Sequence, residues 1–166
     1  MFGIEDKRIK TLRTETAELK ATVTAIHRSQ AVIEFQLDGT IIDANDNFLA
    51  TMGYTIEEIR GRHHSLFVDP RDVASPDYAR FWERLRSGEF FSDAFRRIGA
   101  GGAEIWIEAS YNPVLDSSGK PVKVVKFATE ITATRLKAAE DAGKLAAVSR
   151  AQAVIEFTPE GDILDA

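Results

Sequence analysis

Arg28-Ser-Gln-Ala-Val-Ile-Glu-Phe-Gln-Leu-Asp-Gly-Thr-Ile-Ile-Asp-Ala44 contains two short apolar runs on either side of Asp38-Gly39. The first run is Ala31 to Phe35, and the second begins at Ile41-Ile42. An Asp-Gly pair between two apolar runs is the strongest short-range signal for a β-hairpin. Residues 28–44 are therefore predicted to contain the first two strands of an antiparallel sheet.

The same stretch begins again further along the chain, as Arg150-Ala-Gln-Ala-Val-Ile-Glu-Phe-Thr-Pro-Glu-Gly-Asp-Ile-Leu-Asp-Ala166. The two copies are identical at 11 of 17 aligned positions and lie 122 residues apart. A period of this length indicates duplication of a whole domain rather than a stack of short repeats. We expect a natural protein that continues beyond Ala166, with the chain divided into an N-terminal coiled-coil-like helix (1–30), one complete domain (31–132), a connecting helix (133–149) and the truncated start of a second domain (150–166).

Composition excludes several classes of protein. A formal net charge of −5 gives no general attraction to nucleic acid or anionic lipid. The chain has no cysteine, which excludes disulfides, zinc–thiolate sites and iron–sulfur clusters. No run approaches the ~18 apolar residues needed to cross a bilayer, and the N-terminus lacks the apolar region of a signal peptide. We therefore expect a cytoplasmic globular protein that binds neither nucleic acid nor membrane.

The first 30 residues are predicted to form one helix with a narrow apolar stripe. Its positions follow the alternating spacing of three and four that is typical of a coiled-coil seam: Ile9, Leu12, Thr16, Leu19, Val23 and Ile26. The alternative is an amphipathic helix folded back on its own domain. We favour self-association because the stripe is narrow and includes a threonine. A homodimer formed through the flanking helices is the expected assembly.

Short helices are predicted between residues 45 and 88. Asn45 or Asp46 can cap the first of them, and Gly53 can end it. Thr55-Ile-Glu-Glu58 has the capping-box pattern, and Ser75-Pro76-Asp77 has the N-cap, proline and acid of a longer helix. Residues 62–75 are expected to be loop or short 3₁₀ turns.

Three strands are predicted after residue 88, over Phe90–Ile98, Glu104–Leu115 and Val122–Ile131, with a helix again from Ala133. The order predicts an α+β fold. A five-stranded antiparallel sheet carries short helices on one side and is flanked by N- and C-terminal helices. A sheet with helices on one side leaves room between the layers for a small-molecule pocket.

Several spaced motifs make the chain resemble a PAS sensor domain. Within that family the chain most resembles the tandem PAS modules of soluble bacterial methyl-accepting chemotaxis receptors of the biofilm-dispersal type, although PAS domains are also attached to kinases, cyclases and transcription factors. The resemblance covers residues 28–132, and the repeat at 150 is then the expected start of a second PAS domain. The motifs are Asp38-Gly-Thr-Ile-Ile-Asp-Ala-Asn-Asp-Asn-Phe-Leu-Ala-Thr-Met-Gly-Tyr54, Gly61-Arg-His-His64, Tyr78-Ala-Arg-Phe-Trp82, Trp106-Ile-Glu-Ala-Ser-Tyr-Asn-Pro113 and Ala128-Thr-Glu-Ile-Thr132.

The resemblance implies a non-enzymatic sensory module of a cytoplasmic chemotaxis receptor, which detects a small ligand or a redox or oxygen state. A chemoreceptor signalling domain would follow in the full-length protein. The family's closing Asp-Ile-Thr motif, which passes the signal to the next helix, is matched by Glu130, Ile131 and Thr132. The alternatives are a regulatory PAS domain of a sensor kinase or cyclic-dinucleotide enzyme, and a ligand-free dimerisation module.

Two histidines are candidates for a cofactor site. Related haem-binding PAS sensors take an axial histidine from this region, so the resemblance makes His64 a candidate ligand of haem iron, with His63 beside it. The alternative is that one histidine packs in the core while the other is solvated or bonded to the loop. Phe67, close behind them in sequence, is expected to line the same pocket.

Two tryptophans are considered as possible contacts of a flavin cofactor. Trp82 lies where flavin-binding aerotaxis PAS domains place a tryptophan against the isoalloxazine ring. Those domains carry Arg-His-Pro-Asp in the loop where this chain has Val68-Asp-Pro-Arg71, so only the proline is kept. We therefore favour haem b over FAD, with no cofactor as the third possibility. Trp82 and Trp106 are also candidates for core or sheet-surface positions, and no arrangement of residues typical of a catalytic site is found.

Overall fold

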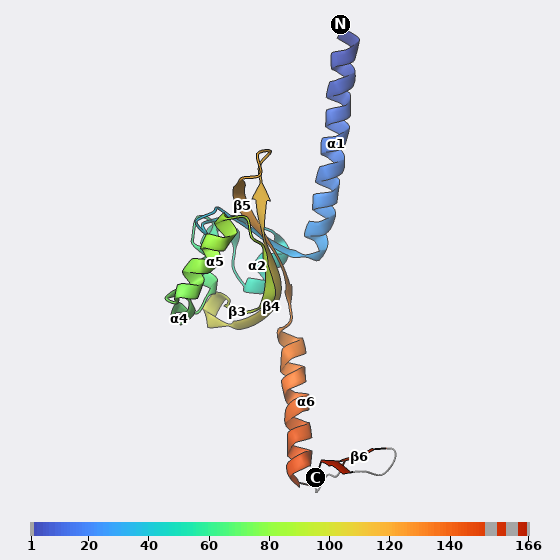
Figure 1. Cartoon of the computed structure of the whole chain (residues 1–166). Helices are drawn as coiled ribbons and strands as arrows, with labels where there is room; N and C mark the ends of the chain where they lie inside the picture. Colours follow the sequence, from blue (N-terminus) through green and yellow to red (C-terminus); the bar gives the residue numbers. More distant parts are fainter. Residues whose placement is uncertain (1, 152–155, 159–162, 166) are drawn as a thin grey trace. The chain divides into compact units, whose positions relative to one another are not determined.

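A computed structural model describes the chain apart from residues 1, 152–155, 159–162 and 166. A long N-terminal helix, α1 (Phe2–Ser29), precedes a five-stranded sheet with the strand order β2-β1-β5-β4-β3 (Figure 1). All neighbouring strands are antiparallel, which confirms the predicted sheet. The strands are β1 (Ala31–Phe35), β2 (Ile41–Ala44), β3 (Phe91–Ile98), β4 (Glu104–Leu115) and β5 (Pro121–Glu130).

The predicted Asp-Gly hairpin joins β1 to β2. Gly39 has a φ of +90°, a conformation that glycine adopts without steric cost. A Cβ atom at this position would also lie 2.5 Å from Nε2 of His63 and 2.9 Å from the Trp82 ring. The turn therefore needs glycine both for its backbone conformation and because two ring side chains pack directly against it.

One asparagine side chain joins the end of α1, β1 and the start of α2 (Asp46–Met52). Oδ1 of Asn45 accepts hydrogen bonds from the backbone N–H groups of Val32 at 2.9 Å and Phe48 at 3.0 Å. Its Nδ2 donates to the carbonyls of His27 at 3.0 Å and Gln30 at 2.8 Å. Asn45 is thus the N-cap of α2, as the sequence predicted, and also fixes the point where α1 enters the sheet.

Capping signals also place the later helices. Thr55 and Glu58 form both halves of the capping box of α3 (Ile56–Ile59), and Ser75 caps α5 (Pro76–Arg86). The expectation of a loop over residues 62–75 holds for the 3₁₀ helix η1 (His64–Phe67) but is wrong for α4 (Pro70–Val73). Asp69 caps α4 ahead of a proline at its first position, which is the signal that also begins α5. A second 3₁₀ turn, η2 (Ala100–Gly102), connects β3 to β4.

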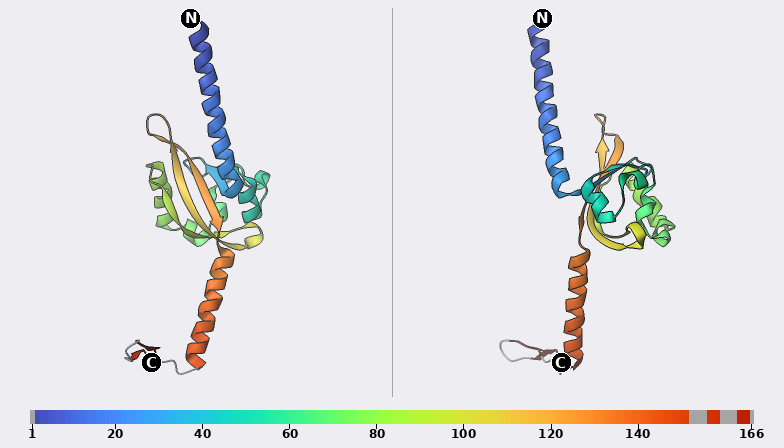
Figure 2. Two further views of the ribbon diagram at one scale, coloured as in Figure 1. Left: turned by 90° about the vertical axis from the view of Figure 1, so that its right-hand side faces the viewer. Right: turned by 180° about the vertical axis from the view of Figure 1, so that it is seen from behind.

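The hydrophobic core lies between the sheet and helices α2 to α5, which cover one face of it (Figure 2). Alternate residues of each strand point into this layer, as the period of two of a β-strand requires. Helix α5 packs against them through Trp82 and Leu85, which are buried. The strand residues of the core are Ala31, Ile33, Phe35, Ile41, Ile105, Ile107, Ala109, Tyr111, Val124 and Ala128.

Residues 131–166 form a separate unit. It contains α6 (Thr132–Ala151) and two short strands, β6 (Glu156–Phe157) and β7 (Ile163–Asp165). These strands pair Glu156 with Asp165 and Phe157 with Ile163, which is the register of Glu34 with Asp43 and Phe35 with Ile41 in the first copy. The apolar residues of 153–166 cannot bury themselves alone, so the sequence predicts that this segment docks on a sheet edge or exchanges with a partner chain. That prediction depends on residues that lie largely outside the described ones. No helix in the described part of the chain is long and apolar enough to cross a bilayer.

Replacing Asn45 with alanine is expected to lower the free energy of unfolding by about 2–4 kcal/mol, because a helix cap and three further hydrogen bonds are lost. Urea unfolding followed by circular dichroism measures the change. Asn47→Ala is the matched control, since Asn47 donates to the carbonyls of His27, Arg28 and Gln30 at 3.1 to 3.2 Å but caps no helix. Equal losses in the two variants would contradict the role given to Asn45.

Candidate functional site

A histidine with both ring nitrogens engaged lies at the centre of the domain. His64 is fully buried at the start of η1. Its Nδ1 is 2.9 Å from the hydroxyl oxygen of Tyr78 on α5, and its Nε2 is 2.9 Å from that of Tyr111 on β4. The rings of Phe35 and Trp82 meet it edge-on, with centroids 5.3 and 5.5 Å away. One side chain thus connects a loop helix, the longest internal helix and the sheet.

Two buried cations surround the Tyr111 hydroxyl. Nη2 of Arg97, on β3, donates to this oxygen at 3.1 Å, while Nη1 donates to the carbonyl of Arg96 at 2.7 Å. Lys126 lies directly opposite Tyr111 in the register of β4 and β5, with Nζ 4.8 Å from the phenol ring centroid. Lys126 is 1% exposed and Arg97 is 8% exposed, so both positive groups lie inside the core.

The two cations dominate the electrostatics of the interior. Burial lowers the pKa of Lys126 to about 8, and its interaction with Tyr111 offsets only part of that effect. Burial alone would raise the pKa of the Tyr111 hydroxyl, but the charges of Arg97 and Lys126 outweigh it, so this pKa is lowered. The pKa of His64 falls well below 6.5, first because of burial and then because of the same two cations. His64 is therefore neutral in the folded protein at pH 7.

The donors in this cluster indicate which nitrogen of His64 carries the proton. Because Arg97 donates to the Tyr111 oxygen, the Tyr111 O–H is left to donate to Nε2 of His64. Nδ1 of the neutral ring then carries the hydrogen and donates to Tyr78. Burial raises the pKa of the Tyr78 hydroxyl to about 12, so it stays protonated. The result is a directed chain of hydrogen bonds from β3 through β4 and η1 to α5.

A cavity of about 290 Å³ lies beside this cluster, under α5 and next to β3. It is near the lower end of the range for small-molecule sites. Its lining combines the buried polar cluster with aromatic walls and an acidic rim: His64, Val68, Asp72, Ser75, Asp77, Tyr78, Phe81, Phe95 and Arg97.

His63, the second candidate histidine, lies beside Tyr78 and Trp82, with ring centroids 6.3 and 6.0 Å away, and holds the loop. Its Nδ1 accepts a hydrogen bond from the backbone N–H of Ser65 at 3.1 Å, and Nε2 lies 2.8 Å from the carbonyl oxygen of Asp38. With Nδ1 acting as acceptor, Nε2–H is the donor to Asp38. His63 therefore ties the β1–β2 turn to η1, which matches the loop-bonding alternative weighed from the sequence.

The aromatic candidates separate into two places. Phe67 is fully buried, with its ring against those of Phe48 and Tyr54, and Trp82 is 4% exposed. Both belong to the core around His64. Trp106 does not join them, because its neighbours Ile105 and Ile107 point into the core and alternation places Trp106 on the other face of β4.

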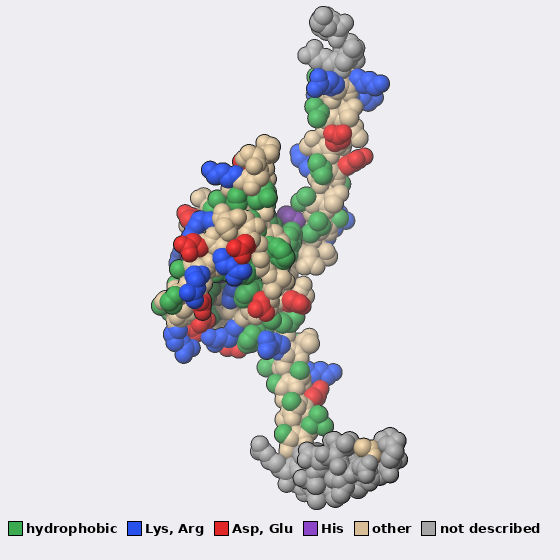
Figure 3. Space-filling model, viewed as in Figure 1, with side chains coloured by type: hydrophobic (Ala, Val, Ile, Leu, Met, Phe, Trp, Pro, Cys, Tyr) green, Lys and Arg blue, Asp and Glu red, His purple; other side chains and the backbone are tan. Residues whose placement is uncertain are grey.

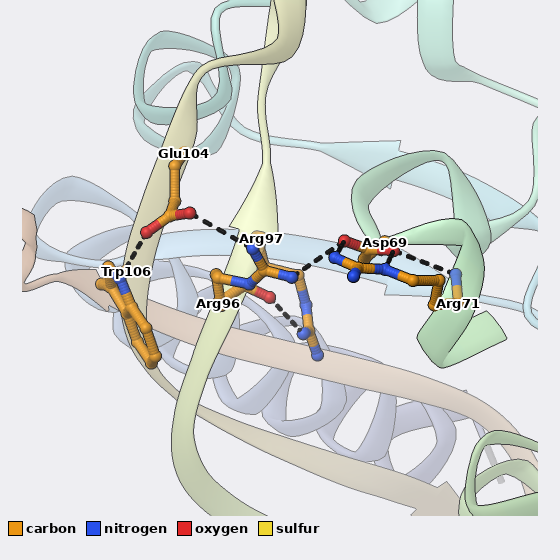
Figure 4. A network of polar contacts seen from close by, with 6 residues as sticks. All are labelled: Asp69, Arg71, Arg96, Arg97, Glu104 and Trp106. Atoms are coloured by element: carbon orange, nitrogen blue, oxygen red, sulfur yellow. Dashed lines mark hydrogen bonds and ion pairs between the residues drawn. The ribbon is translucent and has the colours of Figure 1, made fainter. Parts of the chain in front are cut away.

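Trp106 belongs instead to a network at the edge of the sheet (Figure 4). Its Nε1 donates to Glu104 at 3.1 Å, and Glu104 in turn pairs with Arg96 at 3.2 Å. Arg96 also pairs with Asp69, the cap of α4, at 2.9 Å, and Asp69 binds Arg71 as well. Hydrogen bonds from Arg71, together with one from Arg96, lower the pKa of the Asp69 carboxyl. This network fastens the loop that contains α4 to strands β3 and β4.

The predicted output residues follow one another where the last strand of the sheet leads into α6. Glu130 is the last residue of β5 and is in register with Ile107. Ile131 alone separates it from α6, whose first residue is Thr132, and the Ile131 carbonyl accepts a hydrogen bond from the Arg135 N–H at 3.0 Å.

The arrangement around His64 does not fit haem ligation. Iron binds a neutral imidazole through one free nitrogen, and both nitrogens of His64 are engaged by tyrosine hydroxyls within an aromatic shell. Trp82 likewise packs against Phe35 and Phe81, at 5.8 and 5.6 Å between ring centroids, and presents no free face to a flavin ring. No group of three or more metal-ligating side chains occurs among the described residues.

Three residues of the cluster were missed by the sequence predictions: Tyr111, Lys126 and Arg97. Each lies two residues from an inward-facing apolar side chain on its own strand, such as Val124 and Ala128 on either side of Lys126. A lysine at an inward position of a regular alternation was the available signal. Tyr78 lies four residues before Trp82 on its helix, but nothing in the spacing indicated that its hydroxyl meets His64.

Comparison with known proteins agrees with this fold. The family model described as PAS fold matches residues 41–128. Biofilm dispersion protein BdlA of Pseudomonas aeruginosa is 47% identical over 144 residues, which are 87% of this chain and 34% of BdlA. The Aerotaxis receptor of Escherichia coli is 29% identical over 104 residues, which are 63% of this chain and 20% of that receptor. The chain therefore spans about a third or less of the length of these relatives.

A solved structure gives the same result for the fold. The PAS domain of a protein from Colwellia psychrerythraea superposes with a TM-score of 0.60 at 23% identity, over 69% of this chain and 97% of that domain.

The neutral, buried state of His64 predicts a specific pH dependence of stability. Below about pH 6.5 the unfolded chain binds a proton that the folded chain excludes, so the free energy of unfolding falls by up to about 1.4 kcal/mol per pH unit. Urea unfolding at pH 7, 6 and 5 measures this slope. His64→Gln removes the contribution, whereas His63→Gln, the matched control, keeps it. The same slope in wild type and His64→Gln would show that His64 is not its source.

Proposed function

The chain belongs to the PAS family, and we propose that it is the sensory module of a cytoplasmic chemotaxis receptor. The observation that carries this proposal is the identity of 47% with BdlA over 144 residues, which extends well beyond the PAS match at 41–128. The similarity thus includes segments that flank the PAS domain. These are the segments through which a receptor would pass its signal onward.

The polar cluster supplies a place where a signal can act. A neutral histidine, two tyrosine hydroxyls and two cations are held in one buried network, so a change in ligand or protonation alters several hydrogen bonds together. Lys126 belongs to this network and lies on β5, four residues before Glu130. A displacement of β5 would reach α6 through Ile131, the residue that lies between them in the sequence. We assign signal output to Glu130, Ile131 and Thr132 on this ground.

Dimerisation is assigned to the apolar stripe of α1. Leu12, Leu19 and Val23 are 60%, 68% and 51% exposed, and Figure 3 shows hydrophobic side chains along this helix. An exposed apolar stripe with coiled-coil spacing is expected to be covered by the same helix of a second chain. A dimer is also the form in which a shift of paired helices can carry a signal.

Replacing both Leu19 and Val23 with aspartate is expected to convert a dimer to a monomer while the PAS domain stays folded, because two charges then face each other in the seam. Sedimentation equilibrium gives the mass, and circular dichroism gives the fold. Thr14→Asp with Ala21→Asp is the matched control, since it places the same charges on the side of the helix opposite the seam. An unchanged mass in the seam variant would remove the coiled-coil assignment.

The receptor function is tested with a chimera in which this chain replaces the matching segment of BdlA. The chimera is expected to support biofilm dispersion in a strain that lacks BdlA. A two-glycine insertion after Glu130 should abolish the response, because β5 and α6 are then uncoupled. The same insertion between Ser117 and Ser118, in the turn from β4 to β5, is the control and should preserve it. A folded chimera without dispersion, or a response that survives both insertions, would contradict the proposal.

A further inference from the structure

We propose that the cavity beside Arg97 binds a small organic carboxylate, with the carboxylate on the guanidinium and an apolar body against the aromatic walls. The proposal names a ligand class for the sensory module and rests on the proposed function only for its biological meaning. The evidence for it is the charge, the hydrogen-bond donors and the wall residues of this cavity.

The interior carries positive charge without a counter-ion. Among the residues that the structure describes, neither Arg97 nor Lys126 takes part in an ion pair. Buried charged groups are normally paired because leaving an isolated charge in a low-dielectric interior is costly. Here Arg97 donates to two oxygens that carry no charge at neutral pH when Tyr111 is protonated, the carbonyl of Arg96 at 2.7 Å and the hydroxyl of Tyr111 at 3.1 Å, and Nζ of Lys126 lies over the Tyr111 ring. An anion in the adjacent cavity would supply the missing charge.

Arg97 also has donors left for such an anion. Its Nε is buried and has no hydrogen-bond partner, while Nη1 and Nη2 each make one bond of the two they can donate. The side chain lines the cavity and is more than nine-tenths buried. The remaining N–H groups of Nη1 and Nη2 match the two oxygens of a carboxylate in a parallel pair of hydrogen bonds.

Arg96, the neighbour of Arg97 on β3, has carboxylate partners for its guanidinium. Arg96 is bonded to carboxylates of Asp69 at 2.9 Å and Glu104 at 3.2 Å (Figure 4). Alternation along β3 turns Arg96 and Arg97 to opposite faces. The outward arginine therefore has two carboxylate partners and the inward one has none, so an outside carboxylate completes the pattern.

The rest of the cavity favours a small, partly aromatic or aliphatic ligand. Phe81, Phe95 and Tyr78 form its walls, and the Arg97 guanidinium itself stacks 4.6 Å above the Phe95 ring centroid. Asp72 and Asp77 lie exposed at the rim. Their charges disfavour a polyanion such as a nucleotide and tolerate an amine at the outer end of the ligand. A volume of about 290 Å³ suits a molecule of the size of an aromatic amino acid.

Three probes that share one ring but differ in charge test the proposal on the 166-residue chain. They are 3-phenylpropionate, L-phenylalanine and 2-phenylethylamine, with binding measured by calorimetry and by the shift in Tm. The two carboxylates are expected to bind and raise Tm, and the amine without a carboxylate is expected to do neither. Binding of the amine as tightly as the carboxylates, or no binding of either carboxylate, would overturn the proposal.

Variants then locate the site. Arg97→Gln should weaken binding of the tighter carboxylate at least tenfold, whereas Arg96→Gln, the matched control on the outward face, should leave it within twofold. Circular dichroism checks that both variants fold, and if Arg97→Gln does not, the comparison of three probes on the wild-type chain still decides. Equal binding by a folded Arg97→Gln variant and wild type would overturn the assignment. Since binding is measured on the isolated chain, its failure is distinct from failure of the BdlA chimera.

Discussion

The hydroxyl group of Tyr111 is the point on which the interior of this domain depends. It receives a hydrogen bond from Arg97, meets His64 at 2.9 Å and lies beside Lys126. Apolar packing alone would let the helical layer slide over the sheet, because hydrophobic contacts are not directional. The hydrogen bonds from Tyr111 through His64 to Tyr78 are directional, and they fix η1 and α5 against β3, β4 and β5.

Burying the charged groups of this cluster costs free energy, and this cost makes the cluster responsive to a bound anion. A core that holds two cations and keeps its histidine neutral is less stable than an apolar core of the same shape would be. A ligand can move the equilibrium between two conformations only by its difference in affinity for them. An anion that meets unpaired positive charge has such a difference in affinity, since any conformation that pairs the charge is favoured. The cost of burying Arg97 and Lys126 is thus what a bound anion would relieve.

Most of the fold could be predicted from signals between residues that are close together in the sequence. The site depends instead on contacts between residues that are far apart in the chain. The hairpin at Asp38-Gly39, the caps at Asn45 and Ser75 and the resulting PAS fold are confirmed, because each depends on residues close together in the chain. The helix α4 was missed because its Asp-Pro start was given no weight inside a loop. The contact of Tyr111 with His64 spans 47 residues, and no spacing rule reports which helix covers which strand. Trp106 was named among the pocket candidates and also weighed as a core or sheet-surface residue, and strand alternation places it on the face opposite the core.

The internal repeat distinguishes the residues that build the fold from the residues that form the site. Its identical residues include Phe35 and Phe157, and the two copies pair their strands in the same register with the same irregularity. In the first copy Phe35 packs against His64 and Trp82, so it belongs to the frame that holds the cluster. None of the hydrogen-bonding residues of the cluster lies within the repeated stretch. The similarity between the copies therefore bears on how each hairpin is built, and the ligand that a PAS domain recognises is set by residues outside it, as expected where one fold carries many different sites.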